Sequence, residues 1–153
     1  MQKMRKSSCD CAESFVVIQT SDYRRVKAIL NQGRHPTFIG RQQVLCAARN
    51  GGVLVFCHAG KDVAVALVNP RLNVLTVLCV LPLHRRHGLG SACLTYLQCS
   101  FARVLEAAVP FFERNGYVSV SKLKRGRSLN TQVMVRKDVM ELAGRISRIY
   151  SSA

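Results

Sequence analysis

The chain has 153 residues, a length that fits one domain with a substantial core. Hydrophobic residues make up 48% of it, which excludes a disordered or low-complexity protein. The longest uninterrupted apolar run, Val63–Val68, falls far short of the roughly 20 residues that a membrane-spanning helix needs. The amino terminus is basic and lacks the apolar stretch of a signal peptide, so we expect a protein that is not secreted.

The charge balance is the first feature of the sequence that indicates a binding partner. Lysine and arginine total 23 against 8 aspartates and glutamates, which gives a net charge of +15. So few acidic groups imply a strongly positive surface field, which favours an anionic partner such as nucleic acid, a phosphorylated cofactor or a membrane surface. A basic protein without such a partner is the alternative.

The seven cysteines are an odd number, and they form neither a C-x-x-C pair nor a zinc-finger spacing with histidine. Five of them lie inside apolar segments. We therefore expect reduced, buried thiols in a cytoplasmic protein. Cys9 and Cys11 are the pair that could contact a metal, but we expect no metal site.

The first half of the sequence predicts a flexible amino-terminal segment followed by the start of a folded domain. Residues 1–14 are expected to be a flexible basic segment and residues 15–153 a single domain. The elements expected next are a strand Phe15–Ile18, a helix capped by Ser21 or Asp22, a helix Arg41–Asn50, and the strands Val53–Cys57, Val63–Val68 and Val74–Val80. The short turns between the last three strands require an antiparallel meander, and their apolar sequences predict a sheet covered on both faces.

The second half predicts further helices and a hairpin. In chain order these are a helix Ser91–Gln98, a strand Arg103–Leu105, a helix Phe111–Asn115, a hairpin of Tyr117–Leu123 with Thr131–Val135, and a final helix capped by Asp138. The order β-α-α-β-β-β-α-β-α-β-β-α indicates an α/β (α+β) domain with a mixed sheet. The final helix aligns Val139, Leu142, Ile146 and Ile149 on one face. We expect that face to pack on the domain, with a membrane or a second subunit as the alternative.

One segment has the features of a ligand-binding turn: Val80-Leu81-Pro82-Leu83-His84-Arg85-Arg86-His87-Gly88-Leu89-Gly90. An apolar strand runs into a basic, glycine-containing turn that opens a helix. A helix start offers unpaired backbone N–H groups and the positive end of its dipole, and glycine lets a ligand approach the backbone. The spacing fits neither a Walker loop nor a Rossmann turn. The segment therefore predicts a site for a phosphorylated ligand.

The pattern Val80-x-Pro82-x-x-Arg85-x-x-Gly88-x-Gly90 resembles the acetyl-CoA-binding motif of the GNAT superfamily of N-acyltransferases. A second segment, Ala108-Val109-Pro110-Phe111-Phe112-Glu113-Arg114-Asn115-Gly116-Tyr117, is loosely similar to that family's other hallmark helix. The resemblance covers roughly Ser14–Arg136. The chain also resembles small phage-type GNAT proteins in the segment Arg127-Ser128-Leu129-Asn130.

This resemblance implies a mostly antiparallel central sheet flanked by helices, with two strands separating at the site of an acyl-CoA co-substrate. The backbone amides of the turn would hold the CoA pyrophosphate, and the end of the preceding strand would pair with pantetheine. The Val80 N–H would contact the oxyanion. The residues implied in binding CoA are Leu78, Cys79, Val80, Arg85, Arg86, His87, Gly88, Leu89, Gly90 and Ser91.

The catalytic residues are less evident, because the chain departs from the family. Phe112 stands where the family often has the tyrosine that protonates the thiolate, so Tyr117 becomes the candidate acid. In the family the ring at that place is mostly core. Cys79 could carry the acyl group or simply fill space.

No carboxylate lies on the strand Asn73–Val80 where the family often has a glutamate base. Glu106, His58 and Asp62 are then the candidate bases. A solvated charge is the alternative for Glu106, and a structural imidazole is the alternative for His58. An acceptor amine that arrives already neutral would need no base.

Basic residues concentrate at Tyr23–Arg49 and at Lys122–Arg148, which is more charge than CoA requires. The leading hypothesis is an acceptor amine on nucleic acid or on a molecule bound to it, with DNA modification as its most specific form. The residues expected to bind nucleic acid are Lys122, Lys124, Arg125 and Arg127. The alternatives are a protein or small-molecule N-acetyltransferase and a non-catalytic GNAT binding module. A homodimer stays open.

Overall fold

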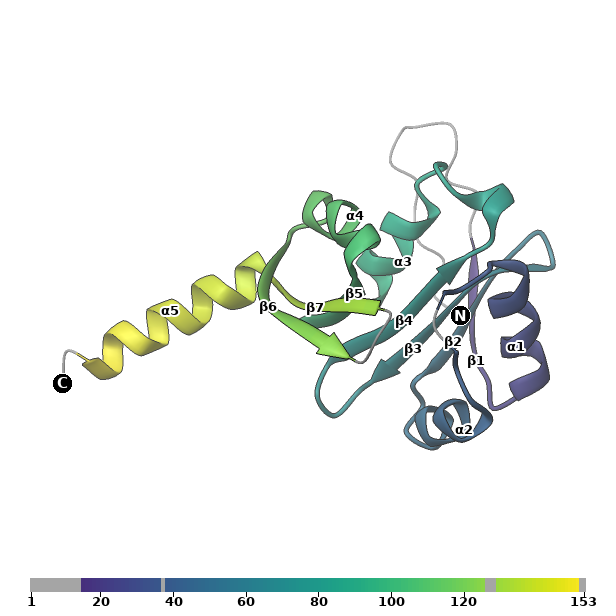
Figure 1. Ribbon diagram of the computed structural model, residues 1–153, viewed down its shortest axis with the longest axis horizontal. Coiled ribbons are helices and arrows are strands. Elements are labelled where there is room, and N and C mark those ends of the chain that lie inside the picture. Colours follow the sequence, from purple (N-terminus) through teal and green to yellow (C-terminus); the bar gives the residue numbers. More distant parts are fainter. Residues whose placement is uncertain (1–14, 37, 126–128, 152–153) are drawn as a thin grey trace. The chain divides into compact units, whose positions relative to one another are not determined.

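The computed structural model describes residues 15–36, 38–125 and 129–151 (Figure 1). Its strands are β1 (Val16–Gln19), β2 (Val53–His58), β3 (Lys61–Asn69), β4 (Val74–Val80), β5 (Phe101–Leu105), β6 (Tyr117–Arg125) and β7 (Leu129–Arg136). Its α-helices are α1 (Tyr23–Gln32), α2 (Arg41–Arg49), α3 (Leu89–Leu97), α4 (Val109–Arg114) and α5 (Lys137–Ser151). Two short 3-10 helices, η1 (Pro82–His84) and η2 (Glu106–Ala108), complete the fold.

The strands are hydrogen-bonded in the order β1-β2-β3-β4-β5-β7-β6. β4 pairs with β5 in parallel, whereas the pairs β1–β2, β2–β3, β5–β7 and β6–β7 are antiparallel. The predicted order of strands and helices and the mixed, mostly antiparallel α/β sheet are therefore confirmed.

The chain forms two compact units. One comprises Met1–Leu67 with Leu78–Leu89, and the other comprises Val68–Val77 with Gly90–Ala153. Residues 1–14, which the sequence predicts to be a flexible basic segment, lie outside the described residues.

In the first unit, α1 is capped at its start, and both α1 and β3 contribute buried residues to the core. The Asp22 carboxylate accepts a hydrogen bond from the Arg25 amide at 3.2 Å and caps the helix, as one of the two predicted caps. Val26, Ile29 and Leu30 of α1 are buried. The five consecutive residues Val63–Leu67 of β3 are buried too, so both faces of this strand are covered, as its apolar sequence predicts.

In the second unit, β5, β7 and β6 form an antiparallel sheet whose core includes Val104 and Met134. The ring of Phe112 from α4 meets that of Tyr117 edge to face, with centroids 5.5 Å apart. Aromatic pairs favour this arrangement.

Two expectations about packing are wrong. Along β4, buried residues alternate with half-buried ones, so one face of this strand is only partly covered. α5 does form, but its apolar face is not packed on its own unit: Leu142 is 58% exposed and Ile146 is 45% exposed. Figure 1 shows α5 running away from the strands that precede it.

The cysteines follow the prediction with one exception. The free thiols of Cys57, Cys79, Cys93 and Cys99 are buried, but Cys46 is exposed because it lies on the outer side of α2. Cys9 and Cys11 lie outside the described residues. None of the described helices is long and apolar enough to cross a membrane.

Candidate functional site

The basic turn joins the end of β4 to α3. The Leu81 amide donates to the Val63 carbonyl at 2.9 Å, and η1 then leads through residues 85–88 to the start of α3 at Leu89. The backbone is left-handed at Arg86 (φ 64°) and at Gly88 (φ 76°). This conformation is strained for most residues and free for glycine, which explains the glycine at position 88.

The turn presents a row of backbone donors. Among the described residues, the amides of Arg86, His87 and Gly88 donate no backbone hydrogen bond. The amides of Leu89, Gly90 and Ser91 belong to the first turn of α3, where helix geometry provides no acceptor. A side chain built on Gly88 would meet nothing within 4 Å, so this part of the turn is open to a ligand. These donors at the positive end of a nine-residue helix fit a pyrophosphate.

Arg85 has a different environment from its neighbours. Its Nε donates to the Val80 carbonyl at 2.9 Å, and its Nη2 donates to the Gly33 carbonyl at 2.7 Å. Its own amide donates to the Pro82 carbonyl at 3.3 Å. The guanidinium therefore connects the end of β4 to the end of α1, and this geometry is that of a positioning group.

Gly33 and Cys79 lie in direct contact beside this bridge. A Cβ on Gly33 would stand 2.2 Å from the Cys79 Sγ, a separation that no real side chain could keep. Cys79 is 3% exposed, and its burial raises the pKa of its thiol. The sequence gives no signal for this contact, because it joins residues far apart in the chain.

Tyr117 is buried, and its hydroxyl donates a hydrogen bond of 2.6 Å to the Cys99 carbonyl. Burial is the main cause that raises the pKa of Tyr117 to about 12. This hydroxyl is committed to the backbone of its own unit.

The candidate bases lie in three different settings. Asp62 accepts two hydrogen bonds from Arg25, at 2.7 and 2.6 Å, and these hold the pKa of its carboxyl below its usual value. Cys57 contacts the same carboxylate at 3.2 Å. Glu106 begins η2 and is exposed, and His58 ends β2 half-buried.

The residues predicted to bind nucleic acid belong mainly to the strand β6. Lys122, Lys124 and Arg125 belong to the backbone of β6, and Arg127 lies outside the described residues. Within the described part of the chain, no three His, Cys, Asp or Glu residues gather in a way that could hold a metal ion.

Comparison with known families identifies the family of this chain. The family model described as "Acetyltransferase (GNAT) domain" matches residues 41–119, more than half of the chain and the whole segment from α2 through the turn to β6. The chain belongs to the GNAT acetyltransferase family. Members of this family are N-acyltransferases, so the chain is an N-acyltransferase whose co-substrate is acetyl-CoA or another acyl-CoA.

Solved structures share the GNAT fold at low sequence identity. Naa50 of Arabidopsis thaliana, in complex with the bisubstrate analogue CoA-Ac-MVNAL, has a TM-score of 0.64 and 16% identity over 81% of this chain and 99% of its own. The ribosomal-protein-S18-alanine N-acetyltransferase of Escherichia coli has a TM-score of 0.61 and 18% identity over 80% and 93%. Ard1 of Thermoplasma volcanium has a TM-score of 0.61 and 16% identity over 80% and 96%. A comparison with curated protein sequences finds no match.

Proposed function

We propose that this GNAT enzyme transfers an acetyl or similar acyl group from CoA to an amine on nucleic acid or on a molecule bound to nucleic acid. The observation that carries the choice of acceptor is the net charge of +15.

For CoA, the amides from Arg86 to Ser91 bind the pyrophosphate, with Arg86 and His87 supplying positive charge. The end of β4, Leu78 to Val80, pairs with pantetheine through backbone groups. Arg85 acts indirectly by fixing the Val80 carbonyl. Its two hydrogen bonds support this role.

The reaction forms a C–N bond as the amine attacks the thioester carbonyl and breaks the C–S bond as CoA leaves. The Val80 N–H stabilises the oxyanion, and backbone donors of this kind contribute strongly in sites that exclude water. The amine loses one proton and the CoA thiolate gains one. We propose Glu106 as the base, because it is an exposed carboxylate directly after β5. Asp62 is the weaker base, because Arg25 holds the pKa of its carboxyl below the usual value. His58 is the second candidate base.

The thiolate takes its proton from water in this scheme. The Tyr117 hydroxyl already donates to the Cys99 carbonyl, which argues for a packing role.

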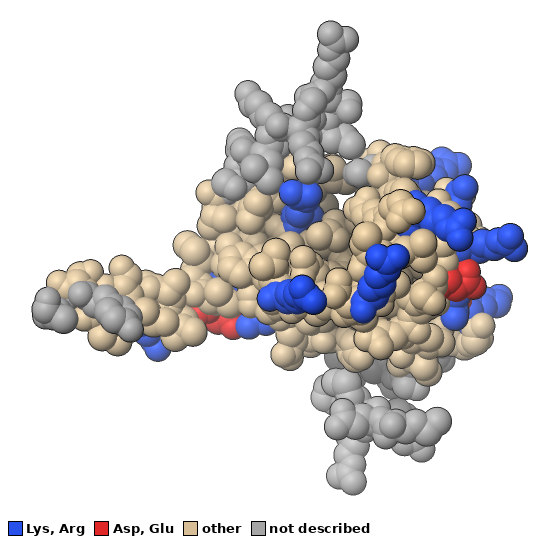
Figure 2. Space-filling model, turned by 90° about the horizontal axis from the view of Figure 1, so that it is seen from below, with Lys and Arg blue, Asp and Glu red and all other residues tan. Residues whose placement is uncertain are grey.

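The acceptor is inferred from charge that the fold leaves uncompensated. Of the eight acidic residues, Asp22 caps α1, Asp62 pairs with Arg25, and Asp138 pairs with Arg136. Blue lysine and arginine side chains clearly outnumber red acidic ones on the face in Figure 2. Several phosphates of one acceptor would neutralise such an excess and make its affinity steeply salt dependent.

A protein or small-molecule amine is the second candidate acceptor. It is favoured by two structural neighbours, one solved with a peptide-containing bisubstrate analogue and one named for the alanine of a ribosomal protein. The segment Arg127-Ser128-Leu129-Asn130, with Arg127 and Ser128 outside the described residues, supports a phage-type enzyme that modifies DNA. The free cysteines support a cytoplasmic location.

The experiment is transfer of radiolabelled acetyl groups from acetyl-CoA into a whole-cell extract, followed by separate nuclease and protease digestion. Label released as a modified nucleoside supports the leading proposal and identifies the base. Label released as peptide, or found in small molecules, overturns it in favour of the second candidate. The matched variants are Lys122→Gln/Lys124→Gln/Arg125→Gln and, as a control on the β3–β4 turn, Arg71→Gln. The leading proposal expects the triple variant alone to lose most of its nucleic-acid labelling.

A further inference from the structure

An aromatic ring faces solvent in the loop that joins α1 to α2. Phe38 is 88% exposed, whereas the next residue, Ile39, is buried and anchors the loop directly beside the ring. A Cβ on Gly40 would lie 3.5 Å from the Cε1 atom of Phe38, so the ring lies close to the start of α2. A single exposed apolar side chain is common in folded proteins, so the surroundings of Phe38 decide its meaning.

The loop presents this ring from a defined position. The Arg34 amide donates to the Asn31 carbonyl at 3.1 Å and closes the end of α1. At the other end, the Val44 amide donates to the Gly40 carbonyl at 3.2 Å and opens α2. Both ends of the connection are therefore fixed to helices of the first unit.

Two exposed arginines flank the ring, and the fold favours neither of them where it stands. Arg34 and Arg41 lie four residues before and three residues after Phe38, so their Cα atoms are at most about 15 and 11 Å from its own. Arg34 has a left-handed backbone (φ 49°), which is strained for a long side chain. Arg41 is the first residue of α2, where the positive end of the helix dipole disfavours a cation. In the described part of the chain, neither side chain makes a hydrogen bond or an ion pair.

The two helices extend this positive surface. No residue of α1 or α2 is acidic, and their exposed side chains are mainly cations and amides, among them Arg24, Lys27, Gln42, Gln43 and Arg49. The described residues of the first unit include nine lysines and arginines against two acidic residues. Both acidic residues are engaged, since one caps α1 and the other pairs with an arginine. The surface around the loop is therefore left with uncompensated positive charge.

The combination of one ring with cations and amides suits a single strand of nucleic acid. Unpaired bases stack on aromatic rings, arginines bind phosphates, and amide side chains bond to the edges of bases. A surface that lies on a membrane presents several large apolar side chains on one face. Among the described residues from 34 to 43, Phe38 is the one large apolar side chain that is exposed. The chemistry of the loop therefore favours nucleic acid over a membrane.

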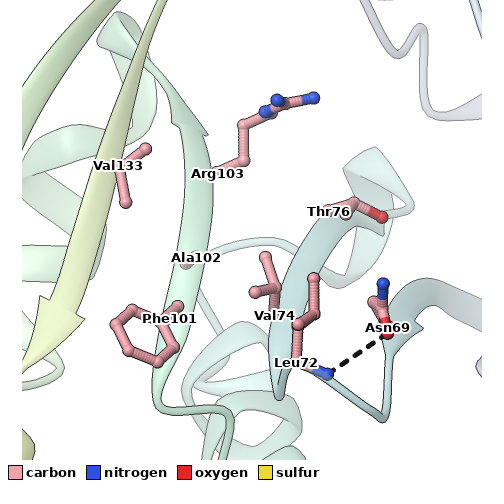
Figure 3. A pocket seen from close by; sticks show the side chains of 8 residues that line it. All are labelled: Asn69, Leu72, Val74, Thr76, Phe101, Ala102, Arg103 and Val133. Carbon is pink, nitrogen blue, oxygen red and sulfur yellow. Dashed lines mark hydrogen bonds between the residues drawn. The ribbon is translucent and has the colours of Figure 1, made fainter.

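The second unit contains another phenylalanine with an arginine near it, in the groove of Figure 3. The groove has a volume of about 310 Å³, and its apolar walls include Leu72, Val74 and Val133. Phe101 is half-buried there, and Figure 3 shows Arg103 extending away from its ring. The groove thus lacks the exposed ring face, with cations on both sides, that a stacked base and its phosphates need.

We propose that the Phe38 surface, formed by Arg34, Phe38 and Arg41, binds single-stranded nucleic acid. One base stacks on the Phe38 ring, and phosphates of the same strand lie at the two arginines. The proposal deepens the proposed function and rests on it in one respect, that the bound strand carries the acceptor amine. Binding itself requires no acyl donor, so it is measured apart from transfer.

The test is titration of the full chain, without acyl-CoA, into a fluorescein-labelled oligothymidylate of 20 nucleotides, followed by fluorescence anisotropy at several salt concentrations. Phe38→Leu is expected to weaken binding about ten- to hundredfold and to leave its salt dependence unchanged, because only a stacked base is lost. Phe38→Tyr should bind like the wild type, because its ring stacks equally well. Circular dichroism checks that each variant is folded.

The charged part of the surface has a separate signature. Arg34→Gln/Arg41→Gln should reduce the slope of log affinity against log salt by about 1.4, because two phosphate contacts of a single strand are lost. Arg71→Gln, an exposed arginine on the β3–β4 turn, is the matched control and should bind like the wild type.

Weak binding by Phe38→Leu, recovery in Phe38→Tyr and the smaller slope of the arginine variant would together support the proposal. A folded wild type that does not bind the oligonucleotide would overturn it, as would equal affinities of the wild type and Phe38→Leu. Vesicles of anionic phospholipid and polyglutamate provide the remaining comparisons. Tighter binding to either of them that depends on Phe38 would assign the surface to a membrane or to an acidic protein, and would equally overturn the proposal.

The labelling of a whole-cell extract separates this proposal from the proposed function. Labelled nucleosides from an enzyme whose oligonucleotide binding ignores Phe38 would retain the function and remove only the Phe38 surface. Binding that depends on Phe38, with label found only in peptide, would retain the surface and remove the nucleic-acid acceptor.

Discussion

Gly33 and Cys79 approach so closely that a Cβ on the glycine would lie 2.2 Å from the Cys79 Sγ. Gly33 has an ordinary φ of −75°, so this requirement for glycine is one of space and not of backbone conformation. The contact brings the end of α1 onto the strand that precedes the basic turn. The contact explains why Gly33, at the end of α1, and Cys79, on β4, limit the size of each other's side chain.

Gly33→Ala is therefore expected to destabilise the protein by about 1–3 kcal/mol, the usual effect of overfilling a packed site. Gly33→Ala/Cys79→Ala should recover part of that loss, because the second change removes the Sγ that the new methyl meets. Gly144→Ala is the control, and it should gain up to about 1 kcal/mol because its Cβ would be uncrowded in a helix. Urea unfolding measures all three. Additive effects of the Gly33 and Cys79 changes would contradict the contact.

Arg85→Lys is expected to lower kcat/KM for acetyl-CoA about ten- to hundredfold. A lysine cannot donate to the Val80 and Gly33 carbonyls together, and hydrogen bonds from charged groups are worth about 1.5–3 kcal/mol. Arg86→Lys is the matched neighbour and should change mainly the salt dependence of KM. Steady-state kinetics at varied acetyl-CoA decide, and equal behaviour of the two variants would remove the positioning role of Arg85.

Tyr117→Phe is expected to retain kcat and to lose about 1 kcal/mol of stability, because only the hydrogen bond to the Cys99 carbonyl is removed. If Tyr117 protonated the thiolate, kcat would fall by about a hundredfold or more. Measuring kcat and the free energy of unfolding on the same sample distinguishes the two roles.

The Arg25–Asp62 pair gives the fold a specific acid sensitivity. The hydrogen bonds from Arg25 hold the folded-state pKa of Asp62 below that of an unfolded aspartate. The stabilisation is therefore present above the unfolded pKa and is lost as the pH falls through the folded pKa. Asp62→Asn should lower the free energy of unfolding at neutral pH. It should also make that free energy depend less on pH below about pH 4. Unfolding curves at several pH values test this, and an unchanged slope in the variant would contradict it.

Much of the fold could be predicted because it depends on local patterns. Val74–Val80 has the same bounds in the sequence analysis and in the structure, since Asn73 and Leu81-Pro82 limit a purely β-forming run. Asp22 was identifiable as a cap from its place before an apolar periodicity.

Features that depend on distant partners could not be predicted. The bridge from Arg85 to Gly33 joins residues 52 positions apart, and a motif alone gives Arg85 a role at the phosphate. The apolar seam of α5 has the same pattern whether it packs on its own domain or on another, so its exposure is known only from the structure.

The central claim is that the amides of the turn from Arg86 to Ser91 bind the pyrophosphate of CoA. Calorimetric titration with acetyl-CoA and with acetyl-pantetheine, which lacks the pyrophosphate, tests it most directly. Gly88→Ala is the informative variant, because its backbone is left-handed and its Cβ would meet nothing. We predict that acetyl-CoA binds at least a hundredfold more tightly than acetyl-pantetheine and that Gly88→Ala removes most of this difference. Equal affinity for the two ligands, or no binding of acetyl-CoA by the folded protein, would contradict the account.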